Sequence, residues 1–433
     1  MHGKRGRDAV EAGPLRLVLL GGAGLMGRAT ARDLLETRPD VSLVLADLDV
    51  AAVERIAGGL HDAVSGAAPR LSVARVDASD PASVRAVIAG ADAVINSVQY
   101  DFNLVVMEAA LGERVPYVDL GGLFHMTRRQ LELGDAFTAA GVTAVIGMGS
   151  TPGVTNVQAR AAADRLETVS SISVWCGNTP NPDALSAWGY SINTILDEVT
   201  KRPVVFRDGA FVELEPLAEP EPFRYLEPIG VQESHHSLHS EIATLPTSFA
   251  AKGVRDVSFK LNHFGYTPRA LRQLKALCDA GVASVDPVVV PARDATDART
   301  AVSVRPRDVL IASLTRDGER LAAEARARGE DPDAFVVDHE EVCVVVDGTR
   351  EGGAARVRID TMARGREDWR LAGGTLLTAT PPGIVACWLA DGSLVAPGVH
   401  PPETVIDPAR LFAELDARGM PTTVDDPDAR PGT

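Results

Sequence analysis

Three glycines and a carboxylate near the N-terminus have a spacing that suits a dinucleotide. Gly22, Gly24 and Gly27 follow the apolar run Leu15–Leu20, and Asp47 ends a second apolar run about 20 residues after the last glycine. In such a turn the first glycine allows a tight bend, the second lets the backbone approach a pyrophosphate, and the third lets the helix pack on the strand. The helix N-terminus then binds the anion. The alternative is a glycine-rich turn without a ligand.

The residues around Asp47 favour NAD over NADP. A carboxylate there hydrogen-bonds the adenosine ribose hydroxyls and repels a 2′-phosphate, and Leu48 and Asp49 offer no cation to hold one. Leu25 and Met26 complete the expected cofactor loop. Asp77, which follows a third apolar run, is a candidate neighbour of the adenine or, alternatively, a helix-start carboxylate.

Polar side chains also follow two later apolar strands. These are Asn96, Ser97, Gln99 and Tyr100 after one strand, and Asp119 with Gly121 after the next. Because ligands of a doubly wound sheet lie beyond the carboxyl ends of its strands, the first set is expected to flank the nicotinamide and the reacting carbon. Asp119 is a candidate to hold a substrate ammonium. Helix capping is the alternative for both sets. A third loop, 147–156, is expected to form a hinge and the floor of a substrate cleft.

A histidine-rich segment in the second half of the chain can exchange protons near neutral pH. It contains His235, His236, His239 and Glu241. A histidine or glutamate there is a candidate general base toward an amine. Zinc held by His236, His239 and Glu241 is an alternative, but no fourth ligand is evident and we expect no metal. Surface or hydrogen-bonded histidines are the other alternative.

Two cations in the same half, Arg224 and Lys260, are candidates to pair with a substrate carboxylate, or else ordinary solvated charges. The four cysteines have no CxxC spacing, so buried reduced thiols of a cytoplasmic protein are expected.

Composition limits the classes of protein that fit this chain. Its 433 residues exceed the usual size of one hydrophobic core, so two domains are expected. The formal net charge of -16 argues against binding a phosphate backbone, so nucleic acid is not an expected partner. The first apolar run breaks at Gly21, which excludes a signal peptide, and no stretch reaches the length of a membrane helix. We expect a cytoplasmic protein without membrane contact.

The first third of the chain alternates short apolar strands with helical stretches. This pattern predicts a Rossmann-type, doubly wound parallel sheet, with a helix at Arg28–Thr37. The expected strands are Leu15–Leu20, Val41–Ala46, Leu71–Val76, Ala93–Ser97, Tyr117–Leu120 and Thr143–Ile146.

After Gly149 the pattern changes to that of a second, mixed α/β domain with antiparallel pairing. The expected elements are strands Ser171–Trp175, Glu341–Val346 and Ala355–Thr361, a hairpin at Pro203–Leu214, and helices Leu185–Thr200, Pro268–Ala280, Arg307–Arg328 and Gly383–Ala390. Residues 291–303 are expected to be a surface loop or insertion, and two prolines to precede the last helix.

Four segments follow from these patterns. We expect a flexible N-terminus over 1–14, an NAD-binding domain over 15–150, and a substrate and dimerisation domain over 151–379. The segment 380–433 is expected to pack back on the first domain and to end in a frayed tail from about Asp425.

With these segments placed, the chain resembles the saccharopine dehydrogenase family over nearly all of residues 15–420, and within it most closely the lysine 6-dehydrogenase branch. The motifs that carry the resemblance are GGAGLMG at 21–27, INSVQYDFN at 95–103, YVDLGG at 117–122, GMGSTPGVTN at 147–156, WGYSINTILDE at 188–198, PVVFRDG at 203–209, HSLHSEIATLP at 236–246 and GVHPPE at 398–403. Ile242, where the family pattern has proline, and Asn178, where it has a second glycine, depart from it near the expected substrate cleft.

The resemblance implies a nicotinamide-dependent oxidoreductase that acts at a C–N bond of an amino acid and forms a homodimer. It places Gln99 and Tyr100 beside the nicotinamide and Asp119 facing the substrate. It also implies that the segment from His239 to Thr244 closes the substrate cleft from the second domain.

Three hypotheses about function remain. The first is oxidative deamination of a primary side-chain amine, with His239 or Asp119 as base and Tyr100 orienting the amine. The second is a saccharopine-type reaction of a secondary amine, which requires two carboxylate anchors. The third is an NAD sensor without turnover.

Overall fold

The computed structural model describes residues 13–179, 192–262, 268–293, 299–329, 335 and 337–427. The chain divides into two compact units. The first comprises residues 1–149 and 378–405, and the second comprises residues 150–377 and 406–433.

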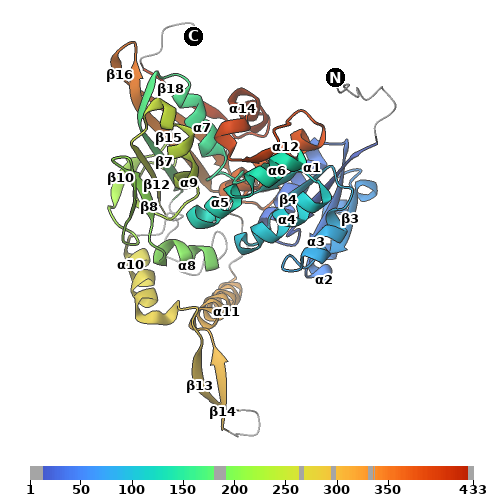
Figure 1. Ribbon diagram of the computed structural model, residues 1–433. Coiled ribbons are helices and arrows are strands. Elements are labelled where there is room, and N and C mark those ends of the chain that lie inside the picture. Colours follow the sequence, from blue (N-terminus) through green and yellow to red (C-terminus); the bar gives the residue numbers. More distant parts are fainter. Residues whose placement is uncertain are drawn as a thin grey trace. The chain divides into compact units, whose positions relative to one another are not determined.

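The first unit contains a seven-stranded sheet whose pairings are all parallel (Figure 1). Its order is β17-β6-β5-β4-β1-β2-β3. The strands are β1 (Leu15–Leu20), β2 (Val41–Asp47), β3 (Leu71–Arg75), β4 (Ala93–Asn96), β5 (Tyr117–Asp119), β6 (Thr143–Val145) and β17 (Gly398–His400). The order reverses direction at β1, as in a doubly wound fold, so the predicted fold class is confirmed.

Helices cover both faces of this sheet. Successive side chains of a strand point to opposite faces, yet Leu17, Val18, Leu19 and Leu20 are all fully buried. The helices of the unit are α1 (Leu25–Thr37), α2 (Val50–Ala63), α3 (Pro81–Ile88), α4 (Asn103–Glu113), α5 (Leu123–Leu131), α6 (Gly134–Ala140), α13 (Pro402–Val405) and the later part of α12 (Gly373–Ala390). Helix α3 begins at Pro81, and the Asp80 side chain caps it by accepting a hydrogen bond from Ala82 N.

Helix α12 corrects one prediction. Pro381 and Pro382 lie inside it, not at its start, because the helix already begins at Gly373. Gly383 lets it approach α1 closely, since a Cβ there would lie 3.3 Å from side-chain atoms of both Leu34 and Thr30.

The second unit contains a nine-stranded mixed sheet. Its main path is β10-β11-β12-β7-β15-β16-β18, and β8 pairs with β12 and β9. Only the β12–β7 pairing is parallel. The strands are β7 (Thr168–Asn178), β8 (Val204–Arg207), β9 (Ala210–Glu213), β10 (Glu221–Arg224), β11 (Val231–His236), β12 (Asp256–Leu261), β15 (His339–Arg350), β16 (Gly353–Arg364) and β18 (Thr422–Asp425).

Six α-helices among the described residues lie wholly in this unit. They are α7 (Val154–Ala163), α8 (Ile192–Thr200), α9 (Glu241–Ser248), α10 (Pro268–Leu277), α11 (Pro306–Ala327) and α14 (Pro408–Asp416). The part of the expected helix and family motif that precedes residue 192 lies outside the described residues. The hairpin β8–β9 turns at Asp208 and Gly209, where both φ angles are positive, as a two-residue hairpin turn requires.

The segment expected to be a loop is instead part of a β-ribbon. Strands β13 (Val288–Arg293) and β14 (Arg299–Val304) pair antiparallel as a separate two-stranded sheet directly before α11 (Figure 1). The missed signal was the share of β-branched residues, with Val288, Val289 and Val290 in β13 and Thr300, Val302 and Val304 in β14.

The C-terminal segment divides between the units. Residues 378–405 group with the first unit, where β17 pairs with β6. The expectation that the whole of 380–433 packs on the first domain is wrong for residues 406–427, which group with the second unit, where β18 pairs with β16. The expected frayed tail does not begin at Asp425, because Asp425 ends β18 and the Asp426 carboxylate pairs with both Arg350 terminal nitrogens at 2.8–2.9 Å. Residues 428–433 lie outside the described residues.

Candidate active site

The glycine turn between β1 and α1 is shaped by contacts that no larger residue permits. Gly21 has a φ of 80°, and a Cβ there would lie 2.8 Å from Ser97 O. A Cβ on Gly27 would lie only 2.2 Å from Gly21 O, so this glycine brings the helix against the turn as predicted. The tight bend was assigned to Gly22, but the left-handed conformation belongs to Gly21. Two adjacent glycines made the assignment ambiguous in the sequence.

The N-terminus of α1 fits a pyrophosphate. Gly24 is its N-cap residue, no side chain caps it, and its first turn, with Leu25 and Met26, contains no acidic residue. Uncapped N–H groups at a helix N-terminus attract an anion. These residues therefore suit the diphosphate of a dinucleotide.

Asp47 lies beside this turn at the end of β2. Its carboxylate accepts hydrogen bonds from Ala23 N at 3.0 Å and Asp49 N at 3.2 Å. Leu48 is exposed, and Arg75 is the register partner of Asp47 on β3. The structure thus brings the predicted ribose carboxylate to the glycine loop, with a cation at the end of the neighbouring strand.

Asp77 forms a local turn after β3. It accepts hydrogen bonds from both the backbone N and the hydroxyl of Ser79, and these bonds lower the pKa of its carboxyl. Asp80, not Asp77, caps α3. The adenine contact stays a prediction.

The residues after β4 divide into buried and accessible ones. Asn96 is buried and donates to Asn103 Oδ1 at 2.9 Å and to Tyr117 Oη at 3.0 Å. The Ser97 hydroxyl donates to Leu20 O at 2.6 Å, so it ties β4 to the glycine turn. Gln99 is exposed and Tyr100 is partly buried. Ser97 is partly buried as well, so Ser97, Gln99 and Tyr100 are the side chains of this set with surface open to a ligand.

Asp119 is the centre of a buried network in the first unit. Oδ2 accepts from Tyr117 Oη at 2.8 Å and Gln130 Nε2 at 2.5 Å, and Oδ1 accepts from Gly121 N at 2.9 Å and Gly147 N at 2.7 Å. Burial raises the pKa of this carboxyl against the effect of these bonds. All four bonds join it to the protein, so the network fixes the loops that follow β5 and β6.

In the second unit, His239 and Glu241 form a dyad at the start of α9. His239 Nδ1 lies 2.5 Å from Glu241 Oε2, and the imidazole stacks on Phe259 with ring centroids 3.8 Å apart. Glu241 is fully buried, and its other oxygen accepts from Thr155 Oγ1 on α7 at 2.8 Å. If Nδ1 donates to the carboxylate, Nε2 has a free lone pair. No hydrogen bond to Nε2 is formed by the described residues.

Thr244 lies one turn farther along α9. Its hydroxyl accepts from Asn156 Nδ2 at 3.3 Å, so α7 and α9 are joined twice by residues of the predicted motifs. The roles of Thr155 and Asn156 were missed because hydroxyl and amide residues near a helix start are usually caps.

The other histidines do not converge on this dyad. His236 Nε2 lies 3.2 Å from Glu219 Oε2 and Nδ1 lies 3.2 Å from Phe259 O. Burial, followed by the nearby Lys260, lowers the pKa of His236, and burial likewise lowers the pKa of His235. The ring nitrogens of His236 thus bond to groups other than those of the alternative zinc set, His239 and Glu241.

The structure does not bring the two cation candidates, Lys260 and Arg224, to the His239–Glu241 dyad. Lys260 Nζ is 2.7 Å from Glu221 Oε2 and 3.1 Å from Glu219 O, so it has local partners. Arg224 is exposed on β10, opposite Val231, at the far end of β11 from His236. At about 3.3 Å per residue that end is about 16 Å away along the strand.

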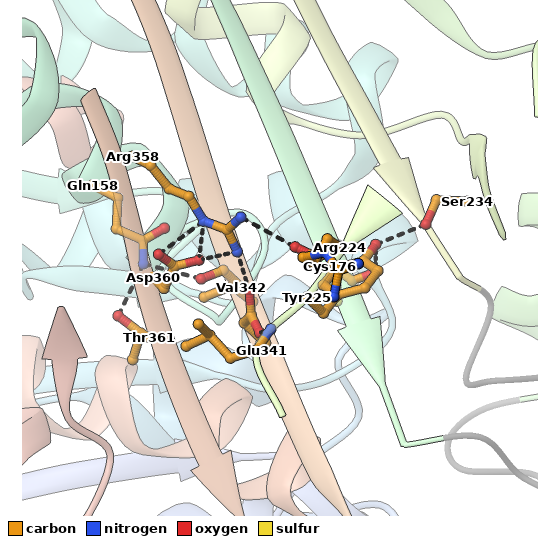
Figure 2. A network of polar contacts seen from close by, with 11 residues as sticks. Gln158, Cys176, Arg224, Tyr225, Ser234, Glu341, Val342, Arg358, Asp360 and Thr361 are labelled. Atoms are coloured by element: carbon orange, nitrogen blue, oxygen red, sulfur yellow. Dashed lines mark hydrogen bonds and ion pairs between the residues drawn. The ribbon is translucent and has the colours of Figure 1, made fainter. Parts of the chain in front are cut away.

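A second buried network lies on β15 and β16 (Figure 2). Arg358 lies between two carboxylates, with Nη2 3.0 Å from Glu341 Oε1 and 2.7 Å from Asp360 Oδ1. Within the described ranges, Glu341, Cys343 and Asp360 are the residues whose ligand atoms lie close enough together for a metal. The guanidinium already supplies the positive charge there, so the arrangement gives no support for a metal.

Comparisons with known proteins identify the family of the chain. The model of the saccharopine dehydrogenase NADP binding domain matches residues 17–145, and that of the saccharopine dehydrogenase C-terminal domain matches residues 149–420. The chain belongs to the saccharopine dehydrogenase family. The family resemblance is therefore confirmed, and with it a nicotinamide cofactor.

Two similar proteins add detail. The fold matches apo saccharopine dehydrogenase (L-Glu forming) from Saccharomyces cerevisiae with a TM-score of 0.66 and 17% identity, over 95% of this chain and 99% of that one. In sequence, the chain is 26% identical over 237 residues to carboxyaminopropylagmatine dehydrogenase from Synechocystis sp.. That match covers 53% of this chain and 58% of the Synechocystis protein.

This saccharopine dehydrogenase family member has no helix, among those described, with the length and apolarity needed to cross a membrane. Its family is one of nicotinamide-dependent dehydrogenases that act on amines and amino acids.

Proposed function

We propose that this protein is an NAD-dependent dehydrogenase that oxidatively deaminates a primary side-chain amine of an amino acid or related compound. The observation that carries the proposal is the His239–Glu241 dyad, with 2.5 Å between Nδ1 and Oε2, in a family whose first domain binds a nicotinamide. Oxidation of an ammonium requires both a hydride acceptor and a base. The first unit has the features of a site for the hydride acceptor, and the second unit has the candidate base.

The residues of the first unit are proposed to hold the cofactor. The uncapped start of α1 would bind the diphosphate, and Asp47 the adenosine ribose. Gln99 and Tyr100 are accessible candidates to contact the nicotinamide side and orient the amine. When bound, the cofactor supplies a hydride acceptor.

His239 is the preferred base. Nε2 would take a proton from the substrate ammonium, leaving a neutral amine whose carbon can lose hydride. The balanced result is an iminium ion, a reduced nicotinamide and one proton, and water then releases ammonium and an aldehyde. The Glu241 carboxylate holds the ring and stabilises the imidazolium.

Asp119, the other candidate base, is less suitable. Its two oxygens already accept four hydrogen bonds from the protein, so a substrate ammonium would have to displace one of them. A role in positioning the loops at Gly121 and Gly147 explains its contacts better.

The second candidate function is oxidation of a secondary amine of the saccharopine type. It is favoured by the two similar proteins, one named a saccharopine dehydrogenase and the other a carboxyaminopropylagmatine dehydrogenase. Both reactions use the same dyad and differ in the group attached to nitrogen.

The test is the absorbance of reduced nicotinamide in a panel of substrates, each offered with NAD and with NADP. The panel contains lysine, ornithine, other diamino acids, saccharopine and carboxyaminopropylagmatine. Reduction with primary amines supports the first function, and reduction with secondary amines alone supports the second. No reduction with any of them contradicts both and favours the NAD sensor. We also expect the protein to be a homodimer and to lie in the cytoplasm. Light scattering tests the homodimer, because it measures the mass of the particle in solution.

A further inference from the structure

Among the described residues of the second unit, the buried carboxylate of Glu340 forms no ion pair with a cation. Glu340, the second residue of β15, is 3% exposed. Among the described ion pairs, Asp197 pairs with Arg307, and Glu341 and Asp360 share Arg358, but no pair includes Glu340. Because an uncompensated buried charge is costly, buried carboxylates usually have a positive partner.

Neutral groups hold one side of this carboxyl in place. Asn178, its register partner on β7, donates from Nδ2 to Glu340 Oε2 at 2.9 Å, and the Ser150 side chain also bonds the carboxyl. The start of α12 packs against it so closely that a Cβ on Gly374 would lie 2.1 Å from Oε2. The orientation of the carboxyl is therefore fixed.

The contacting side chains of Glu340 and Asn178 each have an oxygen outside the hydrogen bond that joins them, and both oxygens are hydrogen-bond acceptors. Glu340 Oε1 and Asn178 Oδ1 are both buried, and neither has a hydrogen-bond partner among the described residues. Buried acceptor oxygens are usually paired with a hydrogen-bond donor, so a group with N–H donors would satisfy both of these oxygens. A positively charged donor suits a carboxylate best. Burial raises the pKa of Glu340 to about 7, consistent with a carboxyl that has no cation nearby.

Glu340 lies in the same region as the dyad. Cys176 lies on β7 two residues before Asn178. Burial raises the pKa of its thiol, and the charges of Glu340, Glu198 and Glu241 raise it further, so Glu340 and Glu241 both act on this one thiol. The segment 147–156 also links the two places, because Ser150 bonds Glu340 and Thr155 bonds Glu241.

We propose that Glu340 and Asn178 form a subsite for a second, non-reacting cationic nitrogen of the substrate, an ammonium or a guanidinium. The subsite rests on the proposed amine dehydrogenase function and narrows its substrate class. Substrates with two positive nitrogens are accepted, and those with a carboxylate in place of the second nitrogen are rejected by repulsion from Glu340.

The test is calorimetric binding of unbranched α,ω-diamines and of the monoamines of the same length to the full chain. We expect the wild-type protein to bind at least one diamine roughly ten- to hundredfold more tightly than its monoamine, since a hydrogen bond to a charged group is being made. Glu340→Gln keeps the shape and loses this preference while monoamine binding is unchanged. Asn178→Ala loses part of it. Glu319→Gln, at an exposed position of α11, is the matched control.

The binding result is independent of turnover, so the two proposals can fail separately. A wild-type protein without preference for diamines overturns the subsite, whatever the variants do. A preference that persists in Glu340→Gln also overturns it and identifies attraction to the acidic surface instead. If the protein oxidises amines but shows no preference for diamines, the proposed function stands and the subsite does not. If the preference for diamines depends on Glu340 but no amine is oxidised, the subsite stands and the proposed function does not.

Discussion

The two ring nitrogens of His239 have different surroundings, and this difference gives the residue its proposed role. Nδ1 faces the buried Glu241 carboxylate, and the ring is stacked on Phe259. Because Glu241 holds Nδ1 and Phe259 packs on the face of the imidazole, Nε2 points in a fixed direction. Glu241 is thus a positioning residue, with Thr155 holding its second oxygen.

Glu241→Gln tests this role. The amide has almost the same shape but cannot stabilise an imidazolium, so we expect kcat to fall at least tenfold while the Kd for NAD is unchanged. Glu241→Asp should recover part of the activity. Steady-state rates and a cofactor titration measure the two quantities, with Glu319→Gln as control. Equal rates in the wild type and Glu241→Gln would remove the dyad from the mechanism.

Asp47→Asn tests the choice of cofactor. The variant keeps an acceptor for Ala23 N but loses the charge that repels a 2′-phosphate. We expect the ratio of NAD to NADP affinity to fall about tenfold or more. Fluorescence titration of both reduced cofactors gives this ratio, and Asp62→Asn, exposed on α2, is the control. An unchanged ratio would contradict the ribose assignment and direct attention to Arg75.

At the scale of elements, the turn between β1 and α1 depends on missing side chains. Gly21 has left-handed backbone and Gly27 touches it, so the first turn of α1 is held against the strand without any capping side chain. The same arrangement leaves the helix N-terminus open to an anion.

Gly27→Ala should damage both stability and cofactor binding. Its Cβ would meet Gly21 O at 2.2 Å, so we expect a loss of about 1–3 kcal/mol in the free energy of unfolding and weaker NAD binding. Gly58→Ala in α2 is the matched control, because nothing lies within 4 Å of its Cβ and alanine favours a helix by about 0.5–1 kcal/mol. Denaturant unfolding compares them, and equal stability of the two variants would show that the close contact is unimportant.

Sequence patterns predicted strands β1 to β6 of the first unit, because most of them are short, continuous apolar runs, but they did not predict β17. They predicted less about the site. The hydrogen bonds of Asp119 come from Gln130 and Gly147, and no local pattern links these residues. Likewise, the partner of Glu241 lies 86 positions away in the chain. The helix α12 was misread because proline usually marks a helix start, whereas here it lies within one.

At the scale of the whole molecule, buried carboxyls link stability to pH. Burial raises the pKa of Glu340 to about 7, and burial together with the Asp360 carboxyl raises the pKa of Glu341. The folded state therefore holds protons that the unfolded state releases above about pH 4.5. The stability from these groups is full below that pH and falls as the pH rises toward 7.

Glu340→Gln removes one of these titrations. We expect the Tm of the variant relative to that of the wild type to rise by a few degrees between about pH 5 and pH 8, because only the wild type must ionise Glu340. Circular dichroism melts across this range, with Glu319→Gln alongside, provide the measurement. Parallel curves for variant and wild type would show that Glu340 does not change protonation there.

Transfer of hydrogen from carbon to nicotinamide is the central claim, and isotope transfer tests it most directly. The protein is incubated with NAD and an amine in which both hydrogens on the carbon next to nitrogen are replaced by deuterium, and the reduced nicotinamide is examined by mass spectrometry. The account predicts one deuterium in each reduced nicotinamide formed, with His239→Ala forming far less product at the same bound cofactor. Reduced nicotinamide without deuterium, or no reduction with any primary or secondary amine, would contradict it.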